Sequence, residues 1–158
     1  MFLRVLRFVR LPLVLLVIWT VLRFLNGPVF GNDYAPRGNA MFSIVGLTII
    51  SALIYGAMSK RIGNFSWLGT ALIGLVLGLF SQILIFTATL ISYLGDFNTY
   101  FRHWDALNVP EGTVVPMAQA MTARAGGLVG GSILIIVVSL IARAVFGALA
   151  PRGNDAAD

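Results

Sequence analysis

Residues 126–146 read GGLVGGSILIIVVSLIARAVF, and this stretch decides the fold class of the chain. Thirteen Leu, Ile, Val and Phe side chains lie between Leu128 and Leu149, and each favours membrane insertion by about 0.3 to 0.6 kcal/mol. Together they outweigh Arg143, which costs up to about 3.5 kcal/mol at the centre of a bilayer. We therefore predict that the stretch crosses a membrane as an α-helix and that its four glycines serve close packing between helices in lipid.

The composition extends this conclusion to the whole chain. Of its 158 residues, 58% are hydrophobic and 11% are charged, and the mean hydropathy is +0.91. A soluble domain of this composition would expose a large apolar surface to water. A bilayer core of about 30 Å requires roughly 20 apolar residues per helix. We predict an all-α integral membrane protein, a single transmembrane domain of residues 1–158 built as an antiparallel bundle of four transmembrane helices. The predicted spans cover approximately residues 5–25, 40–58, 68–94 and 126–149.

The first span is predicted to be a retained signal anchor. Three arginines ahead of an apolar run resemble the start of a cleaved signal peptide. However, Arg23 occupies the place of a small-residue cleavage site, and residues 24–30 contain no A-x-A-like pattern. The three arginines share one arc of a helix before Pro12, and we favour a role in setting topology over an interfacial helix.

The basic residues predict the orientation of the bundle. Cytoplasmic loops carry an excess of Lys and Arg, and residues 59–67, SKRIGNFSW, contain two adjacent basic residues and no acid. We predict a multi-pass protein of the bacterial inner (plasma) membrane with both termini in the cytoplasm. This orientation places Arg4, Arg7, Arg10, Lys60, Arg61, Arg143 and Arg152 on the cytoplasmic side and Arg23, Arg37, Arg102 and Arg124 on the outer side.

Acidic residues and histidine are absent from the four predicted spans. Proton relays and ion-coupled transport normally use such groups inside the membrane, so the sequence argues against a proton-coupled exporter. Haem or chlorophyll bound inside the bundle would also lack histidine ligands. The chain has no cysteine, which excludes disulfides and thiolate metal sites. We predict no catalytic residue, no cofactor and no metal site.

The net charge of +5 is explained by the lipid bilayer, the first predicted partner. Anionic headgroups attract Arg and Lys on the cytoplasmic surface. We therefore expect no nucleic-acid partner.

Glycines in the third and fourth spans predict how the helices pack. In lipid, helices associate through close van der Waals contact and interhelical hydrogen bonds, and small residues permit close approach. We favour a role of these glycines in building the fold over a dedicated dimer interface. The GxxxG pairs are Gly126 with Gly130 and Gly127 with Gly131 in the fourth span, and Gly74 with Gly78 in the third.

The two sets of glycines lie at different depths if the third and fourth spans are antiparallel neighbours. We therefore expect the bulky inner part of the fourth span to sit over Gly74 and Gly78. We expect Ala88, Thr89 and Ser92 of the third span to pack onto the glycines of the fourth.

The third loop, residues 95–125, is the one extramembrane segment long enough to have structure of its own. Its aromatic residues recur at helical spacing, and Trp and Tyr prefer the headgroup layer. We predict an amphipathic interfacial helix with Asp96 as its N-cap, and a second helix from Pro116 that continues into the fourth span. Phe97, Tyr100, Phe101, Trp104 and Leu107 form its apolar side, and Asn98, Thr99, Arg102, His103 and Asp105 form its polar side.

Two polar side chains are candidates for chemistry. Gln82 lies near mid-membrane, and we favour a structural hydrogen bond to a neighbouring helix over contact with a substrate. His103 lies close to acidic residues of the third loop, which is compatible with an acid/base pair or a metal site. We favour the wet face of an interfacial helix because no nucleophile or second histidine accompanies it. Arg23 and Arg143 are expected to extend to the membrane interface from the span ends.

The function that fits these features best is that of a non-catalytic accessory or structural subunit, with other membrane protein subunits as its partners. The alternative is a small oligomeric channel or facilitator for uncharged solutes, with a pore lined by Thr70, Ser81, Gln82 and Thr87. A membrane enzyme built on the third loop is a third hypothesis.

Overall fold

The computed structural model describes residues 1–29 and 43–149, and within these ranges the chain forms helices and turns without a β-strand. The all-α prediction is therefore confirmed for the described residues. Five α-helices and two short 3-10 helices follow one another in these described ranges. They are α1 (Phe2–Phe8), α2 (Arg10–Leu25), α3 (Ile44–Met58), α4 (Trp67–Leu94), η2 (Tyr100–Arg102), η3 (Asp105–Leu107) and α5 (Met117–Phe146).

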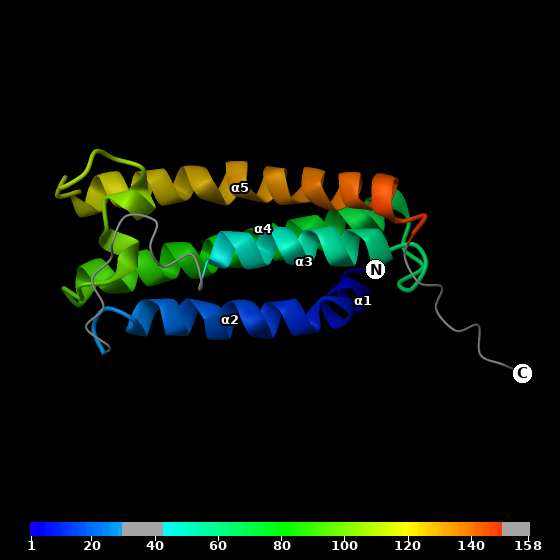
Figure 1. Ribbon diagram of the computed structural model, residues 1–158, viewed down its shortest axis with the longest axis horizontal. Coiled ribbons are helices and arrows are strands. Elements are labelled where there is room, and N and C mark those ends of the chain that lie inside the picture. Colours follow the sequence, from blue (N-terminus) through cyan, green and yellow to red (C-terminus); the bar gives the residue numbers. More distant parts are fainter. Residues whose placement is uncertain (30–42, 150–158) are drawn as a thin grey trace, which may run out of the picture.

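Helices α2, α3, α4 and α5 lie side by side along the long axis, each antiparallel to the one before it (Figure 1). Helix α4 contacts every other α-helix as well as η2, so it is the centre of the bundle. Met1, the α3–α4 turn and the last turn of α5 share one end, which we call the N-terminal end. The segment of residues 95–116 lies at the opposite end, which we call the loop end.

Two helices, α4 with 28 residues and α5 with 30, are long and apolar enough to cross a membrane by themselves. They correspond to the third and fourth predicted spans. Helix α5 begins at Met117 after Pro116, which confirms the predicted helix that continues from Pro116 into the fourth span. Helices α1 and α2 together meet the same criterion but are bent by 62° at their junction. Helix α3 is apolar but has only 15 residues. The helices thus fit a membrane protein, while length and composition alone support two to three spans.

The bend between α1 and α2 has a local cause. Pro12 has no backbone N–H to donate to the carbonyl of Phe8, and its ring clashes with that carbonyl in a continuous helix. The break therefore falls at Val9, and Pro12 lies in the first turn of α2, where it is tolerated. Helix α1 therefore lies at an angle to α2 and packs against α4, with Val5 and Val9 fully buried.

The interior of the bundle combines small and hydroxylated residues with large apolar side chains such as Leu16, Ile73 and Leu77, while many other large apolar side chains face outward. Buried hydroxyls donate to carbonyls of their own helix, as in Thr48 to Ile44 O at 2.7 Å and Thr89 to Ile85 O at 2.8 Å. Such an interior allows close backbone approach, and an apolar exterior suits lipid. The buried face of α4 includes Gly69, Thr70, Gly74, Gly78, Ser81, Ala88, Thr89 and Ser92, and its exposed face includes Leu75, Leu79, Ile83 and Ile91.

Glycines of α4 lie directly against the backbone of α5. A Cβ at Gly74 would stand 2.6 Å from Ile136 Cα, and one at Gly78 would stand 2.9 Å from Ser132 Cα. The inner half of α5 therefore covers both glycines, which is the arrangement expected from their depth.

The predicted interfacial helix of the third loop is wrong. In its place the chain forms η2 and η3, each a single turn. Asp96 does not cap a helix. Its backbone has φ = 50° and that of Asn108 has φ = 54°, so a residue in the left-handed conformation lies on each side of the two turns. Phe101 is 2% exposed because it inserts between the helices instead of lying on the bilayer surface. Burial of this ring inside the bundle decides the course of the loop.

Candidate functional site

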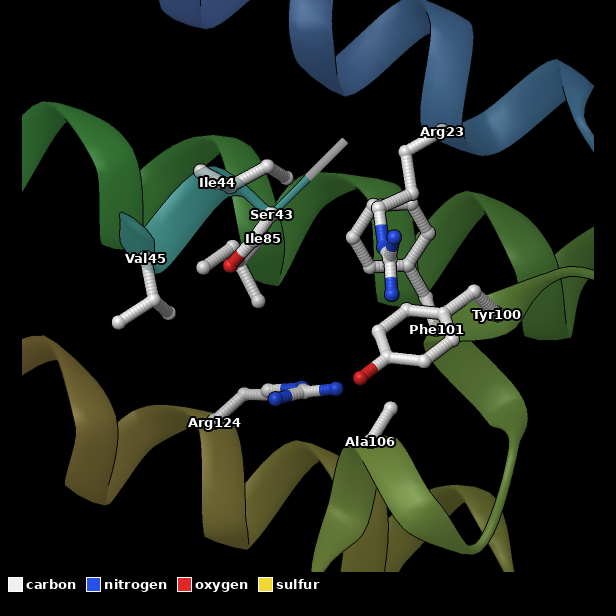
Figure 2. Close-up of a pocket in the computed structure, with 9 residues that line it drawn as sticks. All are labelled: Arg23, Ser43, Ile44, Val45, Ile85, Tyr100, Phe101, Ala106 and Arg124. Atoms are coloured by element: carbon white, nitrogen blue, oxygen red, sulfur yellow. The ribbon is translucent and has the colours of Figure 1, made fainter. Parts of the chain in front are cut away.

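A cavity of about 100 Å³ opens at the loop end, between α2, α3, α4, α5 and the segment of η2 and η3. Arg23 enters it from α2 and Arg124 from α5, on opposite walls, with Tyr100 between them (Figure 2). We call this space the arginine cavity. Ser43, Ile44, Val45, Ile85, Phe101 and Ala106 complete the lining.

Arg23 is buried, with 7% of its surface exposed. Its guanidinium carbon lies 3.6 Å from the centre of the Tyr100 ring, which is a close cation–π stack. The expectation that Arg23 extends to the membrane interface is therefore wrong. Its position in the last turn of α2 points it into the bundle, and the aromatic ring stabilises its charge there.

Arg124 reaches the same cavity from the other side. Its Nε donates a hydrogen bond of 3.1 Å to Thr89 Oγ1, which leaves the outer part of the guanidinium facing the cavity (Figure 2). From the sequence, Arg124 is only one of four basic residues on the outer side. It shares a helical face with Ala120, which is fully buried, and this spacing of four is the signal that places it toward α4.

A second set of hydrogen bonds positions Tyr100 in the cavity. The hydroxyls of Ser92 and Thr99 lie 2.7 Å apart, and both residues are almost fully buried. Thr99 Oγ1 also accepts from Phe101 N at 3.2 Å and so caps η2. The wall that carries Tyr100 is thus tied to α4 rather than to the bilayer surface.

The remaining aromatic residues of the third loop divide between bundle and surface. Phe97, 43% exposed, packs edge-on against Phe24 of α2 at 5.8 Å between ring centres. His103 stacks on Trp104 at 4.8 Å, and both are half-buried.

The acidic residues near His103 do not form a metal site with it. Asp96 instead forms an ion pair with Arg102, with 2.7 Å between Asp96 Oδ1 and Arg102 Nη1. Among the residues that the structure describes, no group of three His, Asp or Glu side chains is close enough to hold a metal ion. His103 Nδ1 accepts a long contact of 3.4 Å from Asp105 N. This arrangement holds a loop in place.

Helix α5 carries a second candidate feature, an open strip of small residues. A Cβ added at Gly126 or Gly130 would meet nothing within 4 Å, in contrast to Gly74 and Gly78. Ala118 and Thr122 continue this exposed row toward the loop end at the same four-residue spacing. We call these four residues the open strip.

The two glycines beside the open strip contact Gln82 of α4. A Cβ at Gly127 would lie 3.0 Å from Gln82 Oε1, and one at Gly131 would collide with Gln82 Nε2. The expectation that Ala88, Thr89 and Ser92 pack onto the α5 glycines is therefore wrong, because the nearest side chain to Gly127 and Gly131 is Gln82 and nothing lies within 4 Å of Gly126 or Gly130. Those three are buried nearer the loop end, where Thr89 receives Arg124.

Gln82 makes no hydrogen bond with any residue in the described ranges, so the interhelical bond expected from the sequence is not present there.

Comparison of the chain with protein-family models, with curated proteins and with solved structures finds no match.

Proposed function

We propose that the chain is a non-catalytic subunit of a larger membrane assembly, crossing the bacterial inner membrane four times with both termini in the cytoplasm. The bent pair α1–α2 and the short helix α3 would serve as the first two spans. Helix α3 is about 22 Å long at 1.5 Å per residue, and the bilayer can thin locally around a short helix at modest cost. The even number of passes agrees with the placement of Met1 and the end of α5 at the same end of the bundle (Figure 1).

The observation that carries the proposal is the open strip next to Gln82. The other tight glycines of the bundle, Gly56, Gly74 and Gly78, are each in contact with a neighbouring helix. Gly126 and Gly130 face outward on α5, next to bulky apolar side chains that are exposed further along the helix, such as Ile133 and Val137. Small residues in this position allow a helix of another protein to approach the backbone of α5 closely.

Gln82 adds a polar reason for a partner at the same depth. A carboxamide without a hydrogen bond is costly in the hydrocarbon core, where water does not replace the missing partner. It lies against Gly127 and Gly131, at the edge of the open strip. A partner helix seated on the strip would come within reach of this amide and would supply an acceptor or a donor. Interhelical hydrogen bonds of this kind contribute about 0.6 to 2 kcal/mol.

The channel alternative has less support because its four pore residues do not share an exposed face. Ser81 is buried and donates to Gly78 O at 2.9 Å. Thr70 is fully buried and lies 2.8 Å from the Ser59 hydroxyl. Thr87 alone among the four is exposed. A pore through a homo-oligomer would have to be lined by other residues.

Co-purification from the native membrane in a mild detergent tests the proposal. We expect the full chain to bring down a larger membrane protein, and Gly126→Leu with Gly130→Leu to lose it because leucine fills the strip. Ala144→Leu is the control for position, since it also introduces a leucine at an exposed position of α5 but at the N-terminal end. Gln82→Leu should weaken capture by about three- to thirtyfold, the equivalent of the lost hydrogen bond.

Two results would overturn this assignment. If the chain migrates alone as a symmetric homo-oligomer and mediates solute flux in proteoliposomes, the channel alternative replaces it. If Ala144→Leu releases the partner as completely as the strip variants do, the open strip is not the docking surface.

A further inference from the structure

We propose that α1 lies in the headgroup layer of the bilayer and binds anionic lipids there, so that it ends the first span at the membrane surface instead of extending it. This placement rests on the crossing by α2 in the proposed function and requires no partner subunit. Helix α2 runs along the long axis of the bundle, and α1 is bent away from it by 62° (Figure 1). With α2 close to the membrane normal, α1 lies nearer to the membrane plane than to the normal.

Contacts inside the chain fix the angle of α1. Arg4 Nη2 donates a hydrogen bond of 2.8 Å to Gly63 O in the turn between α3 and α4. The Phe8 ring packs edge-on against Tyr55 at 5.3 Å and against Phe65 at 5.2 Å between ring centres. The outer surface of α1 is therefore held in place before lipid binds, and binding does not have to order it.

The uncovered part of α1 is amphipathic. At about 100° per residue, Phe2, Leu3 and Leu6 fall on one side of the helix, and Arg4 and Arg7 fall on the other. Phe2 is 56% exposed and Leu3 is 70% exposed, so two large apolar side chains lie outside the bundle next to cations. A helix with this distribution lies in the membrane interface, with its apolar side about 5 to 10 Å deep at the boundary between headgroups and acyl chains.

The charge at this end of the bundle favours anionic lipids. Arg7 and Arg10 are exposed, and residues 1–29 contain four arginines and no acid. The α3–α4 turn that binds Arg4 adds Lys60 and Arg61, again without an acid. Cations beside a bilayer attract anionic headgroups, and an arginine can reach a phosphate while its stem stays among apolar groups.

The lengths of the helices agree with this placement of α1. Helix α2 has 16 residues and α3 has 15, so at 1.5 Å per residue they are about 24 and 22 Å long. The first two spans therefore have nearly equal lengths without α1, which leaves α1 free to lie at the surface.

The depth of α1 is tested with single cysteines, since the chain has none of its own. Leu3→Cys and Val17→Cys each carry a fluorescent label in the full chain, reconstituted in vesicles of phosphatidylcholine and phosphatidylglycerol. Both positions are exposed, one on α1 and one at the middle of α2. We expect a lipid quencher near the headgroups to act mainly on the label at position 3, and a quencher at the end of the acyl chain to act mainly on the label at position 17.

The two labels separate failure of the interfacial helix from failure of the proposed span. If aqueous iodide reaches position 3 and neither lipid quencher does, while position 17 lies deep, the interfacial helix alone is overturned. A position 3 as deep as position 17 would also overturn it, because α1 would then extend the span. A position 17 that no lipid quencher reaches would overturn the proposed crossing by α2, and the placement of α1 with it.

The preference for anionic lipid is measured at position 3, with the same quencher near the headgroup of phosphatidylglycerol or of phosphatidylcholine. We expect phosphatidylglycerol to quench at least about threefold more strongly at equal content, and Arg7→Gln with Arg10→Gln to remove this preference. Arg7→Lys with Arg10→Lys should retain it, because attraction to a charged surface requires only the charge; this pair keeps the test valid if the glutamine pair does not fold. Arg102→Gln, at the loop end, is the control and should leave the ratio unchanged.

Two results would overturn the anionic lipid as the partner of α1. The same quenching ratio in the natural chain and in the glutamine pair would show that the two arginines do not select the headgroup. A preference that appears only in Asp155→Asn with Asp158→Asn would show that acids of the chain itself, which lie outside the described residues, are the counter-ions of α1.

Discussion

The contact between Gly74 and α5 predicts that Gly74→Ala destabilises the bundle, whereas Gly126→Ala does not. The same methyl group is added to a membrane-length helix in each case. At Gly74 it would stand 2.6 Å from Ile136 Cα and 2.9 Å from Ile135 O, while at Gly126 it would meet nothing within 4 Å. The pair therefore isolates helix packing from the chemistry of the substitution.

The magnitude follows from the distance that the helices must yield. Carbon atoms pack at about 3.5 to 4.0 Å, so α4 and α5 would have to separate by about 1 Å around Gly74. A gap of 0.5 to 1 Å already forfeits roughly a quarter to a half of the dispersion attraction, and overpacking typically costs about 1 to 3 kcal/mol. Against this cost, alanine stabilises the interior of a helix by about 0.5 to 1 kcal/mol relative to glycine. We expect Gly74→Ala to lower the free energy of unfolding by about 1 to 2 kcal/mol.

The assay is reversible unfolding in mild detergent by added SDS, followed by far-UV circular dichroism. Gly126→Ala should unfold at the same SDS fraction as the natural chain or at a slightly higher one, since only the helix-propensity gain applies. Equal stability of the two variants would refute the packing of α4 on α5, and with it the explanation of these glycines. A loss at Gly126 alone would show that the open strip is a contact within the chain.

Two further predictions concern the N-terminal half of the bundle and use the same unfolding assay. Arg143 donates hydrogen bonds of 2.6 to 2.9 Å to Phe65 O, Ser66 O and Thr70 Oγ1. Arg143→Gln should therefore lower the free energy of unfolding by about 1 to 2 kcal/mol, after discounting for the exposure of this side chain. An unchanged free energy of unfolding would show that the α3–α4 turn does not depend on Arg143. The buried Ser139 hydroxyl has no hydrogen-bond partner in the described structure, so Ser139→Ala should leave stability unchanged or raise it by up to about 1 kcal/mol, and a clear loss would contradict this reasoning.

The sequence predicts the long helices well because a bilayer demands an uninterrupted apolar run. Helix α4 runs from Trp67 to Leu94, one residue from the predicted start and at the predicted end. Helix α5 begins before the apolar run, as predicted for the helix from Pro116, because a helix can extend beyond the part that hydropathy detects. Residues 117–125 are too polar for that criterion but include several alanines, which favour a helix.

The third loop shows where periodicity misleads. Aromatic residues at helical spacing fit an interfacial helix and equally fit a segment that folds back into the bundle. The choice depends on space between the helices for Phe101 and on the buried Thr99–Ser92 contact, both of which are tertiary. A period alone holds no information about either.

The arginine cavity was likewise beyond the reach of sequence reasoning. Arg23 and Arg124 are far apart in the chain, and the sequence places Arg23 only near the outer end of a predicted span and Arg124 only on the outer side. Their convergence depends on α2 and α5 ending on opposite walls of one space, closed by Tyr100 (Figure 2). The face of α5 on which Arg124 lies could have been found from its spacing to Ala120, but its counterpart on α2 could not.

The buried polar groups divide into those with a hydrogen-bond partner inside the bundle and those without one. Most buried hydroxyls, such as Thr20 and Ser92, donate to a carbonyl of their own helix, so they require no partner outside the bundle. Two groups differ among the described residues: the buried Ser139 hydroxyl has no hydrogen-bond partner, and the half-buried Gln82 carboxamide makes no hydrogen bond. Ser139 lies against Gly56 and Gly74 of the neighbouring helices, whereas Gln82 lies beside Gly127 and Gly131 at the edge of the open strip. A partner helix seated on the open strip, as proposed above, would therefore reach Gln82 and supply its missing hydrogen bond.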